Sequence, residues 1–216
     1  MLIDERKFLN LEAETSLQAV HEAPGSPELF RRTLTGPLTW QQRNEITVRR
    51  ALRSPGQAPQ WVAALLAWDA IVICEGEEQP LADFLLRRRM QPTLEALRVP
   101  LDNLNRTWGE SRVARSPADP PIVAVIAVAD WADGLVESAR LALTGVWHSP
   151  AKLAKSAAML AGGVLDDDQI EGVIAAVQQE VSPPDNFLGS AEYRREMAAV
   201  LTRRALQACR NGANNG

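Results

Sequence analysis

The chain has 216 residues, of which 46% are hydrophobic and 23% charged, and its formal net charge is -4. This composition is typical of a folded globular protein with one large or two small domains, and it argues against a largely disordered chain. The slight negative charge argues against general nucleic-acid binding, because it provides no attraction to a polyanion. The two cysteines form no CxxC pair, the N-terminus has no apolar leader, and no apolar run is long enough to span a bilayer. We therefore expect a cytoplasmic protein without nucleic-acid or membrane partners.

The first half of the chain is predicted to alternate short strands with helices. Ser26, Pro27 and Gly36 supply agreeing start and stop signals for one helix. The continuous apolar run over 60–68 is rich in alanine and leucine and predicts a buried helix. The other expected elements are strands at 7–14, 70–75 and 94–100, and short helices at 16–22 and 80–87.

The stretch 42–70 is predicted to form a strand, a turn and a helix of the kind that can hold an anion. A turn that cradles a phosphate needs small residues, so that backbone N–H groups can approach the oxygens. Arg49 and Arg50 occupy this turn instead. Their guanidinium groups attract phosphate, but their bulk hinders close backbone contact. Whether this turn binds an anion or a nucleotide stays open at this point.

The second half is predicted to be a small antiparallel sheet followed by three helices. Asp133 and Gly134 fit a hairpin turn between two strands of apolar and β-branched residues. Ser149 and Pro150 are expected to open the first helix, and Ser190 is expected to cap the last. The expected strands are 112–115, 122–130 and 136–143, and the expected helices are 150–162, 169–180 and 191–210.

Residues with catalytic or metal-binding chemistry are sparse. His21 and His148 are the only histidines, and neither has a second ligand at metal spacing. The three aspartates at 166–168 can bind a divalent cation, but their place before a predicted helix favours a role at the helix N-terminus. No nucleophile elbow, phosphate-binding loop or zinc-protease motif occurs. We therefore predict no catalytic residue and no metal site.

Three segments of the second half carry a family resemblance: RVARSPADPPIVAVIAV at 112–128, LALTGVWHSP at 141–150 and DNFLGSAEYRREMAAVLTRRAL at 185–206. Together they resemble the C-terminal domain of the flavoprotein subunit of the molybdenum hydroxylases, the family of the CO dehydrogenase medium subunit and xanthine dehydrogenase. In that family the domain is a three-stranded antiparallel sheet with a three-helix bundle. The strands and helices expected from the residues themselves give the same count.

The first half resembles the second lobe of the same family's FAD-binding domain, whose pattern is RN, two residues, TIGGNLA, then PxxD and LALDA. Arg43 and Asn44 lead without a gap to Thr47 and to Asp69 with Ala70. Within this register the family's functional residues are replaced: its glycines correspond to Arg49 and Arg50, its asparagine to Ala51, its proline to Gln57 and its aspartate to Gln60. The family's first lobe, with an AGGTDL turn for the pyrophosphate, has no counterpart in this sequence.

We therefore expect an α+β protein: a remnant of the second FAD lobe at 1–106 with a mixed sheet, a CO dehydrogenase flavoprotein C-terminal-like domain at 107–210, and a disordered tail at 211–216. The resemblance implies a truncated, degenerate homologue of the FAD subunit. It would be a non-catalytic scaffold or assembly module that no longer binds FAD by itself, with no cofactor expected. Its partners would be itself or other hydroxylase-type subunits.

The alternative is an FAD-binding electron-transfer subunit of a molybdenum hydroxylase-type oxidoreductase, with the first FAD lobe supplied by another chain. Thr47, Arg49 and Arg50 would then contact the cofactor.

Overall fold

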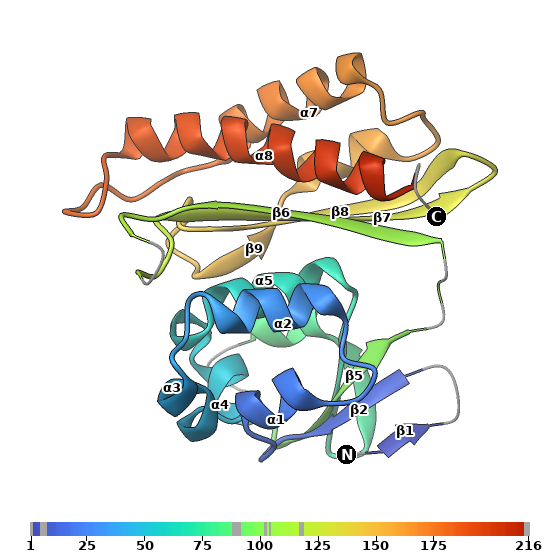
Figure 1. The fold of residues 1–216 in the computed structure, drawn as a ribbon, viewed down its shortest axis with the longest axis vertical. Helices are drawn as coiled ribbons and strands as arrows, with labels where there is room; N and C mark the ends of the chain where they lie inside the picture. The colour runs from blue at the N-terminus through green and yellow to red at the C-terminus, as the bar shows by residue number, and fades with distance from the viewer. Residues whose placement is uncertain are drawn as a thin grey trace. The chain divides into compact units, whose positions relative to one another are not determined.

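The computed structural model describes residues 2–4, 8–87, 92–101, 103, 105–116 and 119–213. The chain divides into two compact units, Met1–Asp102 and Asn103–Gly216 (Figure 1). Each unit combines one sheet with helices, so the expected α+β class is confirmed. In the described part of the chain, no helix is both long enough and apolar enough to cross a membrane.

Unit 1 contains a five-stranded sheet in the order β1-β2-β5-β3-β4. Every neighbouring pair is antiparallel, which differs from the mixed sheet expected from the sequence. Glu75 and Gly76 join β3 directly to β4, and their positive φ angles of 53° and 78° make a tight hairpin turn. A parallel neighbour would need a longer crossover connection, usually a helix. The strands are β1 (Leu2–Asp4), β2 (Phe8–Glu12), β3 (Ile71–Cys74), β4 (Glu77–Pro80) and β5 (Leu94–Pro100).

The helices of unit 1 match the sequence best where the apolar pattern is strongest. The helix α5 is buried from Gln60 to Ala67, as its continuous apolar run predicted. The strand expected at 7–14 is present as β2, and position 7 lies outside the described residues. The helices are α1 (Leu17–Glu22), α2 (Glu28–Thr35), α3 (Trp40–Glu45), α4 (Val48–Arg53), the 3-10 turn η1 (Pro55–Gln57), α5 (Pro59–Ala67) and α6 (Leu81–Leu86).

The strand and turn predicted at the start of 42–70 are wrong. Residues 42–45 belong to the helix α3, and Arg49 and Arg50 lie inside the helix α4. Threonine caps explain the difference. Thr39 starts α3 through a capping box with Gln42, and Thr47 starts α4 by accepting from the N–H of Arg50. Two short capped helices therefore replace the expected strand and turn.

Unit 2 is built on a four-stranded antiparallel sheet in the order β6-β7-β8-β9. The hairpin turn at Asp133 and Gly134 is confirmed, and both residues have positive φ angles. The helix expected at 150–162 is absent. Ala151–Leu153 pairs with β8 as a fourth strand, and a 3-10 helix follows, because backbone groups of this segment find partners at the sheet edge. The elements are β6 (Arg106–Val113), β7 (Val123–Ala132), β8 (Leu135–Thr144), β9 (Ala151–Leu153) and η3 (Lys155–Leu160).

The helices α7 (Asp167–Glu180) and α8 (Ala191–Ala213) cover one face of the unit 2 sheet (Figure 1). Leu201, Ala205 and Cys209 of α8 are buried in this core, whereas Val200 on the same helix is 38% exposed. Gly109 of β6 permits the close approach, since an added Cβ would lie 1.9 Å from the Ala205 carbonyl oxygen. Of the tail expected at 211–216, residues 211–213 continue α8 and 214–216 lie outside the described residues.

Candidate functional site

The start of α4, where the sequence placed an anion-binding turn, has its backbone donors already paired. The first three N–H groups of a helix have no partner within the helix and are the groups that could hold a phosphate. In α4 each finds an acceptor in unit 1: Val48 N–H donates to the Thr15 carbonyl (2.9 Å), Arg49 N–H to the Ala13 carbonyl (2.8 Å) and Arg50 N–H to Thr47 Oγ1 (3.2 Å). The backbone N–H groups at the start of α4 are therefore not available to bind a phosphate.

The side chains of the three candidate cofactor contacts differ in what they offer. The Thr47 hydroxyl serves as the N-cap of α4. The Arg49 guanidinium forms an ion pair with Glu14 at 2.6 Å. Arg50 is exposed and pairs with no residue that the structure describes. Arg50 thus presents an available positive charge, while Thr47 and Arg49 shape the helix start.

At the start of α5, in contrast to α4, backbone N–H groups lack hydrogen-bond partners among the described residues. Its N-cap is Ala58, which has no side chain to accept a hydrogen bond, and Pro59 has no N–H. Among the described residues, no acceptor pairs with the N–H groups of Gln60 and Trp61. The side chains here are also unpaired in the described structure: both amide atoms of Gln60, Nε1 of Trp61 and Oε1 of Gln57 are buried without a hydrogen-bond partner.

Unpaired polar groups of this kind are costly. Gln60 and Trp61 are each 1% exposed, and a buried donor or acceptor without a partner costs about 1–3 kcal/mol. Such groups are rare in folded proteins and call for a ligand, an ion or a water molecule. The unpaired side-chain atoms are two donors, Gln60 Nε2 and Trp61 Nε1, and two acceptors, Gln57 Oε1 and Gln60 Oε1, so a group that completes them must both accept and donate hydrogen bonds. No sequence motif marked these donors, although the resemblance placed family residues at Gln57 and Gln60.

The segment 54–61, which leads into α5, contains no acidic residue. Ser54 and Gly56, in the connection from α4, are exposed. The preceding helix presents the exposed Arg50 and Arg53 in its last turn. The local charge therefore favours an anionic group over a cation.

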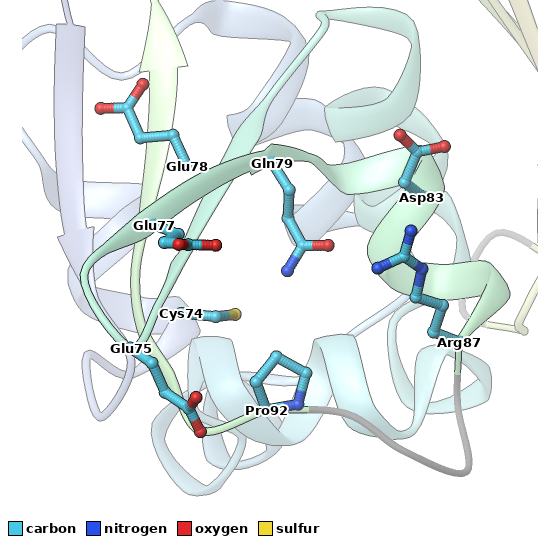
Figure 2. A pocket seen from close by; sticks show the side chains of 8 residues that line it. All are labelled: Cys74, Glu75, Glu77, Glu78, Gln79, Asp83, Arg87 and Pro92. Carbon is cyan, nitrogen blue, oxygen red and sulfur yellow. The ribbon is translucent and has the colours of Figure 1, made fainter.

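A separate pocket of about 400 Å³ lies at the β3–β4 hairpin of unit 1 (Figure 2). The Cys74 sulfur points into it, and burial raises the pKa of this thiol, so it is protonated at neutral pH and a poor nucleophile. The excess of carboxylates disfavours a phosphate here. The lining residues are Cys74, Glu75, Glu77, Glu78, Gln79, Asp83, Arg87 and Pro92.

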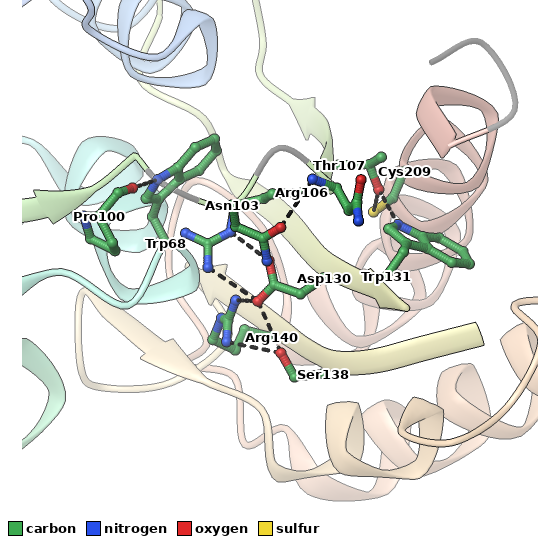
Figure 3. A network of polar contacts seen from close by, with 11 residues as sticks. Trp68, Pro100, Asn103, Arg106, Thr107, Asp130, Trp131, Ser138, Arg140 and Cys209 are labelled. Atoms are coloured by element: carbon green, nitrogen blue, oxygen red, sulfur yellow. Dashed lines mark hydrogen bonds and ion pairs between the residues drawn. The ribbon is translucent and has the colours of Figure 1, made fainter. Parts of the chain in front are cut away.

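Unit 2 contains a buried ion-pair network across β6, β7 and β8 (Figure 3). Asp130 accepts from Arg106 at 2.6 and 3.1 Å, from Arg140, and from the Ser138 hydroxyl at 3.0 Å. Burial alone would raise the pKa of Asp130, but hydrogen bonds from Arg106 and Arg140 outweigh it and lower the pKa. The carboxylate is thus charged at neutral pH with its partners fixed, which is an arrangement for holding strands together.

The side chains of Arg194 and Cys209, also in unit 2, are buried as well. Arg194, which is 3% exposed, donates to the carbonyls of Ile122, Gly145 and Gly189 and to Asn186 Oδ1. Burial raises the pKa of the Cys209 thiol to about 11. In the described part of the chain, no group of three or more His, Cys, Asp or Glu side chains is arranged to hold a metal ion.

Comparison with known proteins finds related chains. Residues 111–209, from β6 to α8, match the model of the CO dehydrogenase flavoprotein C-terminal domain. The carbon monoxide dehydrogenase medium chain of Afipia carboxidovorans is 27% identical over 122 residues, which cover 56% of this chain and 42% of that protein. The chain is a homologue of the FAD-binding medium subunits of the molybdenum hydroxylase family. The resemblance stated from the sequence is therefore confirmed.

Other relatives extend the match along the chain. The nicotine 6-hydroxylase medium subunit of Paenarthrobacter nicotinovorans is 26% identical over 173 residues, covering 77% of this chain and 61% of that subunit. In fold, a chain of the carbon monoxide dehydrogenase of Hydrogenophaga pseudoflava aligns with 97% of this chain and 77% of its own length, at a TM-score of 0.85 and 23% identity. A chain of the quinoline 2-oxidoreductase of Pseudomonas putida 86 aligns at a TM-score of 0.80 and 18% identity, covering 99% of this chain and 78% of its own length. This chain therefore spans less than half the length of the Afipia carbon monoxide dehydrogenase medium chain.

One expectation from the sequence is overturned by these matches. The replaced glycines and aspartate led us to expect no cofactor. The matching family is a flavoprotein family, and FAD is its cofactor. The residues that replace the glycines lie in α4, whereas Gln60, which replaces the aspartate, lies in the first turn of α5 with its amide unpaired. Replacement of these residues was therefore the wrong criterion for the cofactor.

Proposed function

We infer that the chain works as a medium-subunit component of a molybdenum hydroxylase-type oxidoreductase and makes or breaks no substrate bond itself. The match of residues 111–209 to the flavoprotein C-terminal domain is the observation that supports this best. In this role the chain is a scaffold: unit 2 is the C-terminal-like domain, and unit 1 is the second lobe of an FAD site. The networks around Asp130 and Arg194 support the scaffold role, because they use their polar groups to fix the fold.

The flavin part of the proposal assigns roles to the residues of unit 1. When bound, FAD would accept electrons and pass them on. The donors of Gln60 and Trp61 would pair with acceptor atoms of the cofactor, and Arg50 would supply positive charge from the neighbouring helix. Thr47 and Arg49 would keep the start of α4 in place. The first lobe, with the pyrophosphate turn of the family, would come from another segment or another chain.

The partners in this proposal are the other subunits of a hydroxylase-type complex, or a second copy of the chain. The names of the relatives support the first choice, because two of them are a medium chain and a medium subunit. We place the complex in the cytoplasm, where the free thiols of Cys74 and Cys209 would stay reduced.

Isolation of the chain from its own cells tests the proposed function. An affinity-tagged chain is purified under mild conditions, and its size and its partners are determined by light scattering and mass spectrometry. We expect a complex that contains subunits with sequences typical of molybdenum-cofactor or iron–sulphur proteins. A chain that elutes alone, as a monomer, would contradict the subunit role.

A further inference from the structure

The turn Asn186–Gly189, which precedes α8 in unit 2, presents apolar side chains to solvent. Among the described residues, Phe187 is the most exposed large hydrophobic residue, at 84%, and the adjacent Leu188 is 37% exposed. Single exposed apolar residues are common on protein surfaces, so exposure alone does not indicate a binding site. The way in which this turn is held and charged distinguishes it.

The backbone of the turn is fixed by hydrogen bonds from two arginines. Arg194, which is buried, donates to Asn186 Oδ1 at 2.8 Å, and the N–H of Leu188 donates to the same oxygen at 3.0 Å. Arg115 donates to the Phe187 carbonyl at 2.6 Å. An aromatic side chain on a fixed backbone loses little conformational entropy when a partner covers it. Side chains of this kind contribute most of the affinity in many protein interfaces.

Arg115 adds a positive charge beside the apolar side chain. It is exposed, and its guanidinium carbon lies 5.9 Å from the centre of the Phe187 ring. In the described part of the chain no carboxylate pairs with Arg115, whose Nη2 donates to the Phe187 carbonyl. The other N–H groups of the guanidinium suit a carboxylate, because the two groups form charge-assisted hydrogen bonds. The complementary surface is therefore an apolar pocket with a carboxylate at its rim.

We propose that the turn Asn186–Gly189 docks on another subunit of the hydroxylase-type complex. Phe187 and Leu188 enter an apolar pocket of that subunit, and Arg115 pairs with a carboxylate at the rim of the pocket. The inference rests on the proposed function, because the partner is a subunit of that complex. It adds which surface of this chain the partner contacts and what chemistry the partner offers.

Photo-crosslinking from position 187 tests the contact in the native complex. The photoreactive analogue p-benzoylphenylalanine is placed at position 187 of the tagged full chain, the complex is isolated from its own cells and irradiated, and the linked peptide is identified by mass spectrometry. We expect a peptide of another subunit, with apolar residues at the linkage and an aspartate or glutamate close by. The matched control carries the analogue at Leu86, which is 82% exposed in unit 1 and should not link to that peptide.

Two variants measure how much the turn contributes to binding of the subunit identified in this way. Phe187→Ser should weaken binding at least about thirtyfold and change the melting temperature by no more than about 2 °C, because the side chain is exposed. Arg115→Gln keeps a donor for the Phe187 carbonyl but removes the charge. It should weaken binding about fivefold at low ionic strength, and the difference should disappear at high salt. Leu86→Ser should leave the affinity unchanged.

The outcomes separate this inference from the proposed function. If the complex is recovered but Phe187→Ser binds as tightly as the wild type, or position 187 links to no other subunit, the inference is overturned and the subunit role stands. A link between two copies of this chain also overturns it, in favour of self-association through the turn. A wild-type chain that recovers no other subunit contradicts the proposed function and the inference together.

Discussion

Replacing Asp130 by asparagine tests whether the buried network of unit 2 holds the strands β6, β7 and β8 together. Asp130 is 5% exposed and accepts hydrogen bonds from Arg106, Arg140 and Ser138. Asparagine keeps the shape but removes the negative charge that Asp130 presents to two largely buried guanidinium groups, those of Arg106 and Arg140. Removing one partner of a buried ion pair costs about 3–5 kcal/mol. At about 4 °C for each kcal/mol, the melting temperature of unit 2 should fall by about 12–20 °C.

Differential scanning calorimetry of the full chain measures this loss, because it resolves the unfolding of the two units if they melt separately. The matched control is Asp133→Asn, in the exposed hairpin turn, where asparagine also tolerates the positive φ angle of 52°. Its effect should stay within about 0.5 kcal/mol.

The same variant has a defined pH dependence. The pKa of Asp130 is lowered in the folded protein, because the hydrogen bonds from Arg106 and Arg140 outweigh the effect of burial. Its stabilisation is therefore fully present above the unfolded pKa of about 3.9 and is lost as the pH falls through the lower folded pKa. The difference between wild type and Asp130→Asn should shrink below about pH 4. A loss under about 1 kcal/mol at neutral pH would refute the reasoning.

Three further predictions concern packing, a buried cation and a thiol. Gly109→Ala should destabilise unit 2 by at least about 2 kcal/mol in denaturant titration, since its Cβ would strike the backbone of α8; Gly172→Ala, inside α7 with an ordinary 3.7 Å contact, should instead stabilise it by up to about 1 kcal/mol. Arg194→Met removes the buried donor of the Ile122 and Gly145 carbonyls and the bonds to Asn186 and Gly189, so it should cost at least about 3 kcal/mol. Because the bonds to Asn186 and Gly189 hold the turn that carries the exposed Phe187, chymotrypsin should cleave there faster, and an unchanged cleavage rate would count against the prediction. Cys209 should resist a thiol reagent at pH 8 in the folded protein and react on unfolding, because its pKa is about 11, and rapid labelling of the native thiol would contradict its burial.

The sequence predicted most of the fold where local signals and tertiary packing agree. Asp133 and Gly134 specify a hairpin turn, and the apolar run of α5 specifies a buried helix. The prediction failed where the outcome depends on distant backbone partners. Ala151–Leu153 became a strand because β8 offers it a sheet edge, although Ser149 and Pro150 resemble a helix start. The orientation of the strands in unit 1 likewise depends on which strands become neighbours.

In the candidate site, too, local sequence signals predicted one part and distant backbone partners decided the other. The sequence located the relevant stretch, since the resemblance aligned 42–70 with a flavin-binding segment. It did not show which helix start would be open, because the donors of α4 are paired by the carbonyls of Ala13 and Thr15, which are about 35 residues away in the sequence. The unpaired amide of Gln60 is a property of the packed structure. Replacement of the glycines therefore predicted the loss of a cofactor that the family retains.

The FAD content of the native assembly tests the central claim most directly. The tagged chain is isolated from its own cells together with its partners, the protein is denatured, and the released flavin is identified and quantified by fluorescence. A medium-subunit homologue that completes an FAD site should release about one FAD for each copy of the chain. A pure and intact assembly that releases no flavin, and takes up none when FAD is added, would contradict the account.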